Sequence, residues 1–279
     1  MSTLAGGRQV YEPHRIGLPP VRPYLRELWR RRQFAFELAR TNLRAQQFNT
    51  VLGQLWLIVN PLLLAFVFFV LVAIVRGGSR GSEFFAHLML GLFAYRLVST
   101  SVKQGSRSVV SSGRLILNTA FPRTLLPLAS VLTAFMRFLP TLAVYAVVHG
   151  IAGLPLGPQL LWAIPVVALL VVLSSGAAML AAAAQVYFRD LTNILPYVLR
   201  IWLYLSPVLY YVDDIPERYE TIAAANPLYA LLGSLSEAVN QGETPSAGFL
   251  AVGAAWALGF FVVGAVFFMS REREFAVRL

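Results

Sequence analysis

The sequence contains no cysteine and a single lysine, and only 13% of its residues are charged. Without cysteine, the chain forms no disulfide framework and no thiolate metal site. A nucleotide-binding loop needs a Gly-Lys-Ser/Thr ending. The one lysine, Lys103, lies between Val102 and Gln104, so this loop is absent and the chain has no nucleotide site of this kind.

Apolar residues dominate instead. They make up 57% of the sequence, and the mean hydropathy is +0.65, whereas charged residues alone make up about a quarter of a typical soluble domain. The composition predicts an all-α membrane protein. Six apolar runs reach the roughly 18 residues that are needed to cross the hydrocarbon core of a bilayer. We place these spans at 51–75, 84–104, 124–149, 159–187, 194–211 and 246–269.

The basic residues follow this topology. Of the 23 Arg and Lys residues, 17 lie on the side of the two termini, whereas segment 212–245 on the other side carries six acidic residues and one arginine. Positive residues collect on the cytoplasmic side of membrane proteins. We therefore expect a multi-pass protein with both termini in the cytoplasm, and the net charge of +10 does not indicate nucleic-acid binding.

We expect the first 50 residues to form a cytoplasmic segment before the membrane-spanning region 51–279. They contain nine arginines and no long apolar run, so we expect no cleavable signal peptide. Within them, residues 24–43 alternate apolar and basic side chains at near-helical spacing, which predicts an amphipathic helix at the cytoplasmic interface. The alternative is a solvated helix. The apolar positions are Leu25, Leu28, Trp29, Phe36, Ala39 and Leu43.

Two further segments are too short to span. Residues 105–123 are polar and basic, and they predict a short cytoplasmic helix between the second and third spans. Residues 219–239 are apolar but broken at Asn226-Pro227, because proline lacks a backbone donor. We expect a short re-entrant helix pair here, within a broken external hairpin at 212–245. An ordinary external loop is the alternative.

The sequence offers few residues for enzyme catalysis or for ion-coupled transport. His14, His87 and His149 are far apart in the expected topology, so no metal site is predicted. The spans contain no Asp or Glu to relay protons or sodium, and their only central charges are Arg96, Arg137 and Arg200. The external pair Asp213-Asp214 is interpreted as solvated. A membrane-embedded glycosyl- or phosphotransferase would need catalytic carboxylates or a metal motif, and none is visible.

Five short motifs occur along nearly the whole chain in a fixed order. They are LGQLWLIVNP at 52–61, FPR followed by TLLPLA at 121–129, YFRDL at 187–191, SPVLYYVDDIPERY at 206–219 and NPLYAL at 226–231. In these motifs the sequence resembles type-2 ABC exporter permeases of the polysaccharide branch, which export O-antigen, capsule or teichoic acid. Among known members it most resembles actinobacterial permeases for lipid-linked galactan.

The resemblance implies a transport subunit of the bacterial inner or plasma membrane without a cofactor of its own. Two permease copies would work with two cytoplasmic ABC ATPase subunits, which bind ATP, and would move a lipid-linked polysaccharide to the outer leaflet. A drug or antibiotic exporter permease is the alternative within the same class. The resemblance also implies that the 105–123 segment and the turn after the fourth span couple to the ATPase. The coupling residues would be Arg114, Phe121, Pro122, Arg123, Arg189 and Asp190.

Two of these assignments have alternatives. Arg189 could simply anchor the turn at the lipid headgroups, and Asp190 could cap the following helix. At the far end of that helix, Ser206-Pro207 should weaken the span. Together with Asn226-Pro227, this pair is the predicted external gate.

Aromatic spacing in the fifth span predicts a substrate path. Tyr197, Arg200, Tyr204 and Tyr211 recur at helical spacing, and the rings and hydroxyls of tyrosine suit sugars. Trp56 is a further candidate. Aromatic residues also gather at membrane interfaces without any ligand, and this remains the alternative. At depth, Arg200 could meet a pyrophosphate-linked lipid head group or a neighbouring carbonyl.

Overall fold

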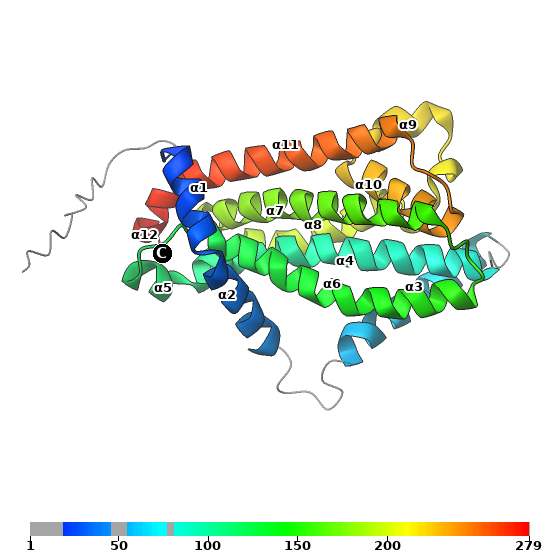
Figure 1. Ribbon diagram of the computed structural model, residues 1–279, viewed down its shortest axis with the longest axis horizontal. Helices are drawn as coiled ribbons and strands as arrows, with labels where there is room; N and C mark the ends of the chain where they lie inside the picture. Colours follow the sequence, from blue (N-terminus) through cyan, green and yellow to red (C-terminus); the bar gives the residue numbers. More distant parts are fainter. Residues whose placement is uncertain (1–18, 46–54, 77–80, 279) are drawn as a thin grey trace, which may run out of the picture.

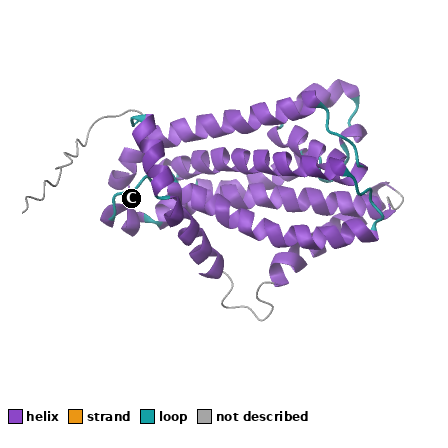
Figure 2. Ribbon diagram, viewed as in Figure 1, coloured by secondary structure: helices purple, strands orange, loops and turns teal. Residues whose placement is uncertain are grey.

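The computed structural model describes residues 19–45, 55–76 and 81–278, and these residues form helices joined by short loops (Figures 1 and 2). No strand occurs among them, which confirms the predicted all-helical fold. Residues 52–54 of the first motif and residues 1–18 of the N-terminal segment lie outside the described residues.

Four helices in the described part are long and apolar enough to cross a membrane. They include α4 (Gly81–Ser111), α6 (Leu125–Ile151), α7 (Ala163–Tyr187, preceded by the turn η2, Pro158–Trp162) and α11 (Ala247–Arg271). The first and fifth predicted spans correspond to α3 (Trp56–Arg76), with a shorter apolar stretch at Leu62–Ile74, and to α8 (Leu191–Leu205). That α3 and α8 also cross the membrane, as the six predicted spans require, thus stays a prediction.

The fifth helix is shorter than predicted. Helix α8 ends at Leu205, and Ser206 has extended backbone angles (φ −97°, ψ 150°) because the residue before a proline is disfavoured in the helical region. The expectation that 206–211 continue this helix is wrong. Tyr211 therefore does not share a helical face with Tyr197, Arg200 and Tyr204.

Helix α4 forms the centre of the bundle, and small residues allow its neighbours to approach closely. A Cβ atom at Gly105 of α4 would lie 2.6 Å from Cβ of Ala178 in α7, and one at Gly264 of α11 would lie 2.2 Å from the carbonyl oxygen of Gly176 in α7. Small residues at such crossings are typical of membrane helices, which gain stability from close packing. Thus α4, α7 and α11 pack as a layer, with α6 on the other side of α4 (Figure 1).

The predicted interfacial helix is two helices, α1 (Val21–Arg30) and α2 (Arg32–Ala45), which meet at Arg31. The buried face of α2 consists of Ala35 and Ala39, and the Thr133 hydroxyl of α6 donates a hydrogen bond to the Ala39 carbonyl (3.3 Å). Trp29 and Phe36 are exposed. The small residues are therefore what pack on the bundle, while part of the predicted apolar stripe faces outward.

The predicted break at Asn226-Pro227 separates two helices, α9 (Glu217–Ala224) and α10 (Pro227–Ser236). Before them lies the turn η3 (Val212–Asp214), and after them the π-helical turn η4 (Glu237–Gln241). Residues 228–236 of α10 are all buried, whereas α9 has no buried residue. Only α10 is thus enclosed by the bundle, where it packs against α11, α7 and α4.

The bundle has two ends. We call the "α10 end" the one that carries α9, α10 and the start of α4, and the "α5 end" the opposite one (Figure 1). The α5 end carries α1, α5 (Gly113–Asn118), the turn η5 (Glu272–Glu274) and α12 (Phe275–Arg278). The predicted short helix within 105–123 corresponds to α5, although α4 itself continues to Ser111.

Candidate functional site

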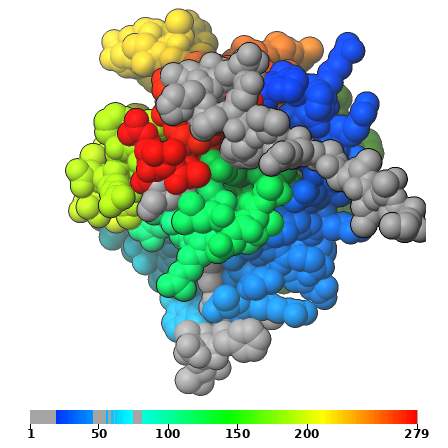
Figure 3. All heavy atoms as spheres, turned by 90° about the vertical axis from the view of Figure 1, so that its left-hand side faces the viewer, coloured from blue at the N-terminus to red at the C-terminus, as the bar shows by residue number. Residues whose placement is uncertain are grey.

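The α5 end brings together segments that are far apart in the sequence. In Figure 3, which views this end, the α5 region lies beside the C-terminal residues, with the N-terminal helices on one side and α8 on the other. An apolar layer lies beneath this surface and includes Ile116, Val186, Phe268 and Phe275. These four residues come from α5, α7, α11 and α12, so the ends of these helices rest on a common base.

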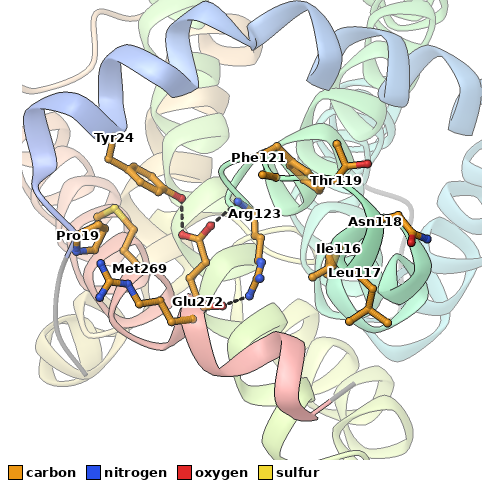
Figure 4. A pocket seen from close by; sticks show the side chains of 12 residues that line it. Pro19, Tyr24, Ile116, Leu117, Asn118, Thr119, Phe121, Arg123, Met269 and Glu272 are labelled. Carbon is orange, nitrogen blue, oxygen red and sulfur yellow. Dashed lines mark hydrogen bonds between the residues drawn. The ribbon is translucent and has the colours of Figure 1, made fainter. Parts of the chain in front are cut away.

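Glu272 lies at the centre of the polar contacts here (Figure 4). Its carboxylate accepts a hydrogen bond from the Tyr24 hydroxyl (2.5 Å) and another from the backbone N–H of Arg123 (2.5 Å). The Arg123 guanidinium donates to the backbone carbonyl of Glu272. One residue after the last long helix therefore joins α1 to the FPR motif.

Tyr24 completes this contact from the side of α1. Burial raises the pKa of the Tyr24 phenol above its usual range, and the neighbouring Glu272 carboxylate raises it further. The phenol therefore keeps its proton and donates it to Glu272. Its oxygen also lies 2.5 Å from the Thr124 hydroxyl, which must be the donor of that bond because the single phenol proton is already used.

A hollow of about 450 Å³ opens next to these residues. It is lined by Tyr24, Phe121, Arg123 and Glu272, by the end of α5 and by the loop that follows it (Figure 4). Its lining is both polar and apolar. A hollow with backbone groups, charged side chains and an aromatic ring suits an inserted protein side chain or loop better than a lipid tail.

The N-terminal helices hold the loop before α6 from its other side. The Arg31 guanidinium donates to the carbonyl of Ala120 (2.7 Å) and pairs with Glu27 (2.5 Å). The rings of Phe34 and Phe121 lie 5.2 Å apart. Residues 120–123 are thus fixed by α1, α2 and Glu272 together.

A second set of contacts joins the C-terminus to α7. Glu274 accepts a hydrogen bond from the Tyr187 hydroxyl (2.6 Å) and pairs with Arg271 (3.2 Å) and Arg278 (3.6 Å). The Arg278 guanidinium also lies over the Tyr187 ring, 4.4 Å from its centroid. The C-terminal turn is therefore fastened to the residue that directly precedes the α7–α8 turn.

The structure places the six predicted coupling residues at this one end, and their coupling role stays a prediction. Phe121 and Arg123 line the hollow, and Pro122 is buried. The side chains of Arg114, Arg189 and Asp190 are exposed. Asp190 occupies the position before α8, but its side chain makes no capping hydrogen bond. The alternative that it acts as a helix cap is therefore wrong, because the residue itself has helical backbone angles (φ −69°, ψ −13°).

Sequence reasoning missed Glu272, the partner of Arg123, and with it Tyr24 and Thr124, which complete the same junction. One signal was present: Glu272 stands directly after an apolar run, between Arg271 and Arg273. An acidic residue at the basic end of a span indicates a specific partner. The identity of that partner, some 150 or 250 residues away in the chain, was not visible from spacing.

The predicted path residues separate into two groups. Tyr197, Arg200 and Tyr204 are exposed along α8, and the Tyr204 ring contacts Phe68 of α3 edge-on (6.4 Å). Trp56, at the start of α3, is also exposed. Tyr211 instead packs against the His87 ring, with a centroid distance of 4.3 Å, at the α10 end. It belongs to a packed aromatic cluster and not to the open face of α8.

The two predicted gate pairs are in direct contact. The Asn226 side chain donates to the Ser206 hydroxyl (3.1 Å) and to the Leu205 carbonyl (2.9 Å), and it accepts from the Trp202 indole (2.8 Å). It also caps α10, because its oxygen accepts from the N–H of Leu228 (3.0 Å). A proline follows each of the two residues. Pro207 follows Ser206, the residue directly after α8, and Pro227 follows Asn226 and begins α10.

No group of three or more His, Cys, Asp or Glu side chains that could hold a metal ion occurs in the described ranges. The buried central helix and the long apolar helices define a membrane-embedded helical protein that has a polar surface at one end.

Comparison with known proteins gives the class. Residues 32–240 match the family model of the ABC-2 type transporter, and the chain belongs to this family. The resemblance to type-2 ABC permeases is thereby confirmed. A Myxococcus xanthus protein named O-antigen export system permease protein RfbA is 29% identical over 259 residues, which cover 90% of this chain and 97% of that protein. Two Klebsiella pneumoniae proteins of the same name are each 28% identical and cover 68% and 72% of this chain and 74% and 78% of their own lengths.

Proposed function

We propose that the chain is the permease subunit of an ABC exporter that moves a lipid-linked polysaccharide, of galactan or O-antigen type, from the cytoplasmic to the outer leaflet. Separate ATPase subunits supply the energy. The proposal is supported by the family match and by the names of the relatives. In this reading the α5 end faces the cytoplasm and the α10 end faces outward, as the distribution of basic residues predicts.

The observation that carries the proposal is the junction around Glu272. A permease without a nucleotide site must receive motion from another protein and pass it to its spans. At the α5 end, the FPR loop is bonded to α1 and to the end of α11, and the loop continues directly into α6. A push on this loop would therefore reach α1, α6 and α11 together.

The exposed cations complete this surface. Arg114 lies in α5, and Arg189 and Asp190 lie in the turn between α7 and α8; both segments are at the α5 end of the bundle, and all three side chains are exposed. Short charged turns on a rigid base can contact a partner without unfolding any part of the bundle. We therefore assign the hollow and the α7–α8 turn as two contact points for one ATPase subunit.

We further propose that two permease copies form the exporter, because one copy presents its path residues on an open face. Arg200 and Tyr204 are exposed on α8 of a single chain, whereas a polymer needs an enclosed route. A two-fold pair of such faces closes a route with the fewest different contacts.

The test uses the full chain, alone and co-expressed with a candidate partner ABC ATPase. The chain alone should not hydrolyse ATP, whereas the pair should hydrolyse ATP and export polysaccharide in cells. An Arg123→Ala, Arg189→Ala, Asp190→Ala triple variant should insert normally, yet lose most ATPase co-purification and most export. Arg218→Ala, at the other end, is the matched control. Normal export by the triple variant would refute the docking assignment, and export of drugs without polysaccharide would favour the drug-exporter alternative.

A further inference from the structure

A groove within the helical bundle carries three basic side chains. It has a volume of about 350 Å³ and is bordered by α3, α4 and α8. Arg96 and Lys103 of α4 and Arg200 of α8 line it, and all three are exposed. The hydroxyl-bearing residues Ser99 and Thr100 lie between the two α4 cations. The rest of the lining is mainly leucine, so the groove combines cationic and apolar surface.

The cations form a line along one face of α4. Arg96 lies halfway along the helix, about 22 Å from either end at 1.5 Å per residue. Lys103 and then Arg107 follow towards the α5 end at steps of seven and four residues, which keep one helical face. Arg96 also borders a smaller hollow of about 50 Å³, together with Arg137 of α6. A continuous basic track thus runs from the α5 end to the middle of the bundle.

The helices around the groove supply no negative charge to balance this track. The sequence contains no Asp or Glu from residue 84 to residue 189, and none in α3 or α8. Among the residues that the structure describes, the charged groups of Arg96, Lys103 and Arg200 form no ion pair and no hydrogen bond. Unbalanced charge at this depth is costly, so a counter-charge from outside the chain is needed.

We propose that this groove binds the phosphate or diphosphate head group of a lipid, with the lipid chain lying along α3 and α8. Guanidinium groups bind phosphate oxygens through two parallel hydrogen bonds, and hydroxyl groups such as those of Ser99 and Thr100 add further donors. The apolar flanks identify a lipid and not free phosphate as the ligand, because Leu64 of α3 and Leu92, Leu199 and Leu203 line the groove, and Leu64 is exposed. Binding of the head group does not depend on the proposed function; only the transport of that lipid rests on it.

The line of cations also suggests a direction of movement. A head group that enters near Arg107, close to the α5 end, meets Lys103 next and Arg96 at mid-depth, where Arg200 approaches from α8. Successive cations about 6 to 10 Å apart along the helix axis let an anion move in steps from one partner to the next. The groove would therefore draw the head group from the cytoplasmic leaflet into the bundle.

Binding is measured on the full chain in nanodiscs of neutral phosphatidylcholine, without ATPase, by native mass spectrometry with a polyprenyl diphosphate as the probe. An Arg96→Gln, Arg200→Gln double variant should bind about tenfold more weakly or worse. Arg218→Gln, an external arginine, should bind as the wild type does. An Arg96→Lys, Arg200→Lys variant keeps the charge but not the fork geometry, and it should lie between the two.

Three further probes identify the ligand chemistry. The matching polyprenol without phosphate should not bind, and inorganic diphosphate should compete only weakly. Equal binding of polyprenol, full displacement by inorganic diphosphate, or equal displacement by phosphatidylglycerol would each overturn the proposal. Unchanged binding by the double variant would overturn it as well. Lys103→Gln supplies a second variant if the double variant does not fold, and its binding should be several-fold weaker.

The outcome is independent of the transport assay. Head-group binding that depends on Arg96 and Arg200, in a chain that exports no polysaccharide, would refute the proposed function and leave this site standing. Conversely, wild-type levels of polysaccharide export by the Arg96→Gln, Arg200→Gln variant would refute the site and leave the proposed function intact.

Discussion

The two ends of the bundle are held together by different chemistry. At the α5 end, carboxylates join separate segments: Glu272 accepts hydrogen bonds from a buried position, and Glu274 forms ion pairs at the surface. At the α10 end, neutral groups form buried bonds, such as His87 to the Ser236 hydroxyl (2.8 Å) and Tyr145 to the Asn240 amide oxygen. Both ends connect residues that are distant in the sequence.

This difference suggests that the two ends have different roles. The surface ion pairs of Glu274 cost little to exchange, because water or another protein can replace either partner, and the buried Glu272 keeps the FPR loop on α1 meanwhile. Buried neutral bonds cannot be exchanged without leaving a group unsatisfied. The α5 end is thus suited to respond to a partner, and the α10 end to hold α10 and η4 in fixed positions within the bundle.

The largest effect on stability is expected from Glu272→Ala at the α5 end. This change leaves the backbone N–H of Arg123 without its acceptor and removes the acceptor of the Tyr24 hydroxyl. The loss should be about 3 kcal/mol of unfolding free energy, since both bonds are made to a buried carboxyl group and its removal leaves their donors unsatisfied. Thermal unfolding in detergent measures it.

Glu274→Ala is the matched control two residues further on. Glu274 is more exposed, and its partners Arg271 and Arg278 lie at the surface, so the cost should be about 1 kcal/mol or less. Equal losses from the two alanine variants would show that burial does not distinguish these carboxylates. The buried and the exposed carboxylate would then contribute equally to stability.

A smaller but clear effect is expected from Asn226→Ala at the α10 end. The change removes the cap of α10 and the bridge from Trp202 to the end of α8. Loss of a helix cap typically costs about 1 to 2 kcal/mol. Asn226→Asp keeps an acceptor for both groups and should recover most of this loss. If Asn226→Ala unfolds at the wild-type temperature, the end of α8 is not held by this residue.

Much of the fold could be predicted from composition and local signals. Apolar runs of sufficient length located α4, α6, α7 and α11 to within a few residues at most of their ends, except that α4 extends further on both sides. The Asn226-Pro227 break was predictable for a local reason, because proline cannot continue a preceding helix. The early end of α8 was missed because hydropathy continues through Val208 and Leu209 although the backbone signal of Ser206-Pro207 had ended the helix.

The candidate site could be predicted only in part. The exposed turn at Arg189-Asp190 and the FPR loop were recognisable, since charged residues between spans must lie at a membrane face. The junction of Tyr24, Arg123 and Glu272 was not, because its contacts depend on how α1 and α11 pack against α6 and not on spacing along the chain. Arg96 and Lys103 share the groove with Arg200 for the same reason: packing of α8 on α4 brings them together.

A still smaller effect, dependent on pH, is expected from Glu237→Gln at the α10 end. Burial and the nearby carboxylates of Asp213 and Glu243 raise the pKa of Glu237 above its ordinary value of 4.5. The folded protein then binds this proton more tightly than the unfolded chain, so stability falls as the pH rises from about 4.5 through the raised pKa. At neutral pH the Gln variant should be more stable, by less than about 1 kcal/mol because Glu237 is partly exposed.

Melting curves of the wild type and Glu237→Gln between pH 4 and pH 7 test this expectation. The two curves should converge at the acidic end. Glu217→Gln, which alters an exposed carboxylate on α9, should show no such trend. A Gln variant that is less stable at neutral pH would mean that the charged form of Glu237 is favoured in the fold.

The smallest effect on stability is expected from Tyr204→Ala, although its effect on transport should be large. Tyr204 is 48% exposed on α8, and its ring makes one edge-on contact with Phe68. Exposed substitutions usually change stability by no more than about 0.5 kcal/mol. If the open face of α8 forms the polysaccharide path, the variant should assemble with the ATPase and hydrolyse ATP, yet export less polymer.

Cysteine labelling separates a path from a face that is simply exposed to lipid. The chain has no cysteine of its own, so a single Tyr204→Cys change gives one reactive site, and Leu203→Cys, at a position only 8% exposed, is the neighbouring control. A membrane-impermeant polar thiol reagent should modify position 204 in the assembled exporter and spare position 203, because a water-filled route admits such a reagent and a face covered by lipid excludes it. Protection of both positions would place Tyr204 against lipid or against the second copy. In that case α8 joins the two ends of the bundle as a structural strut, and the polymer passes along another face.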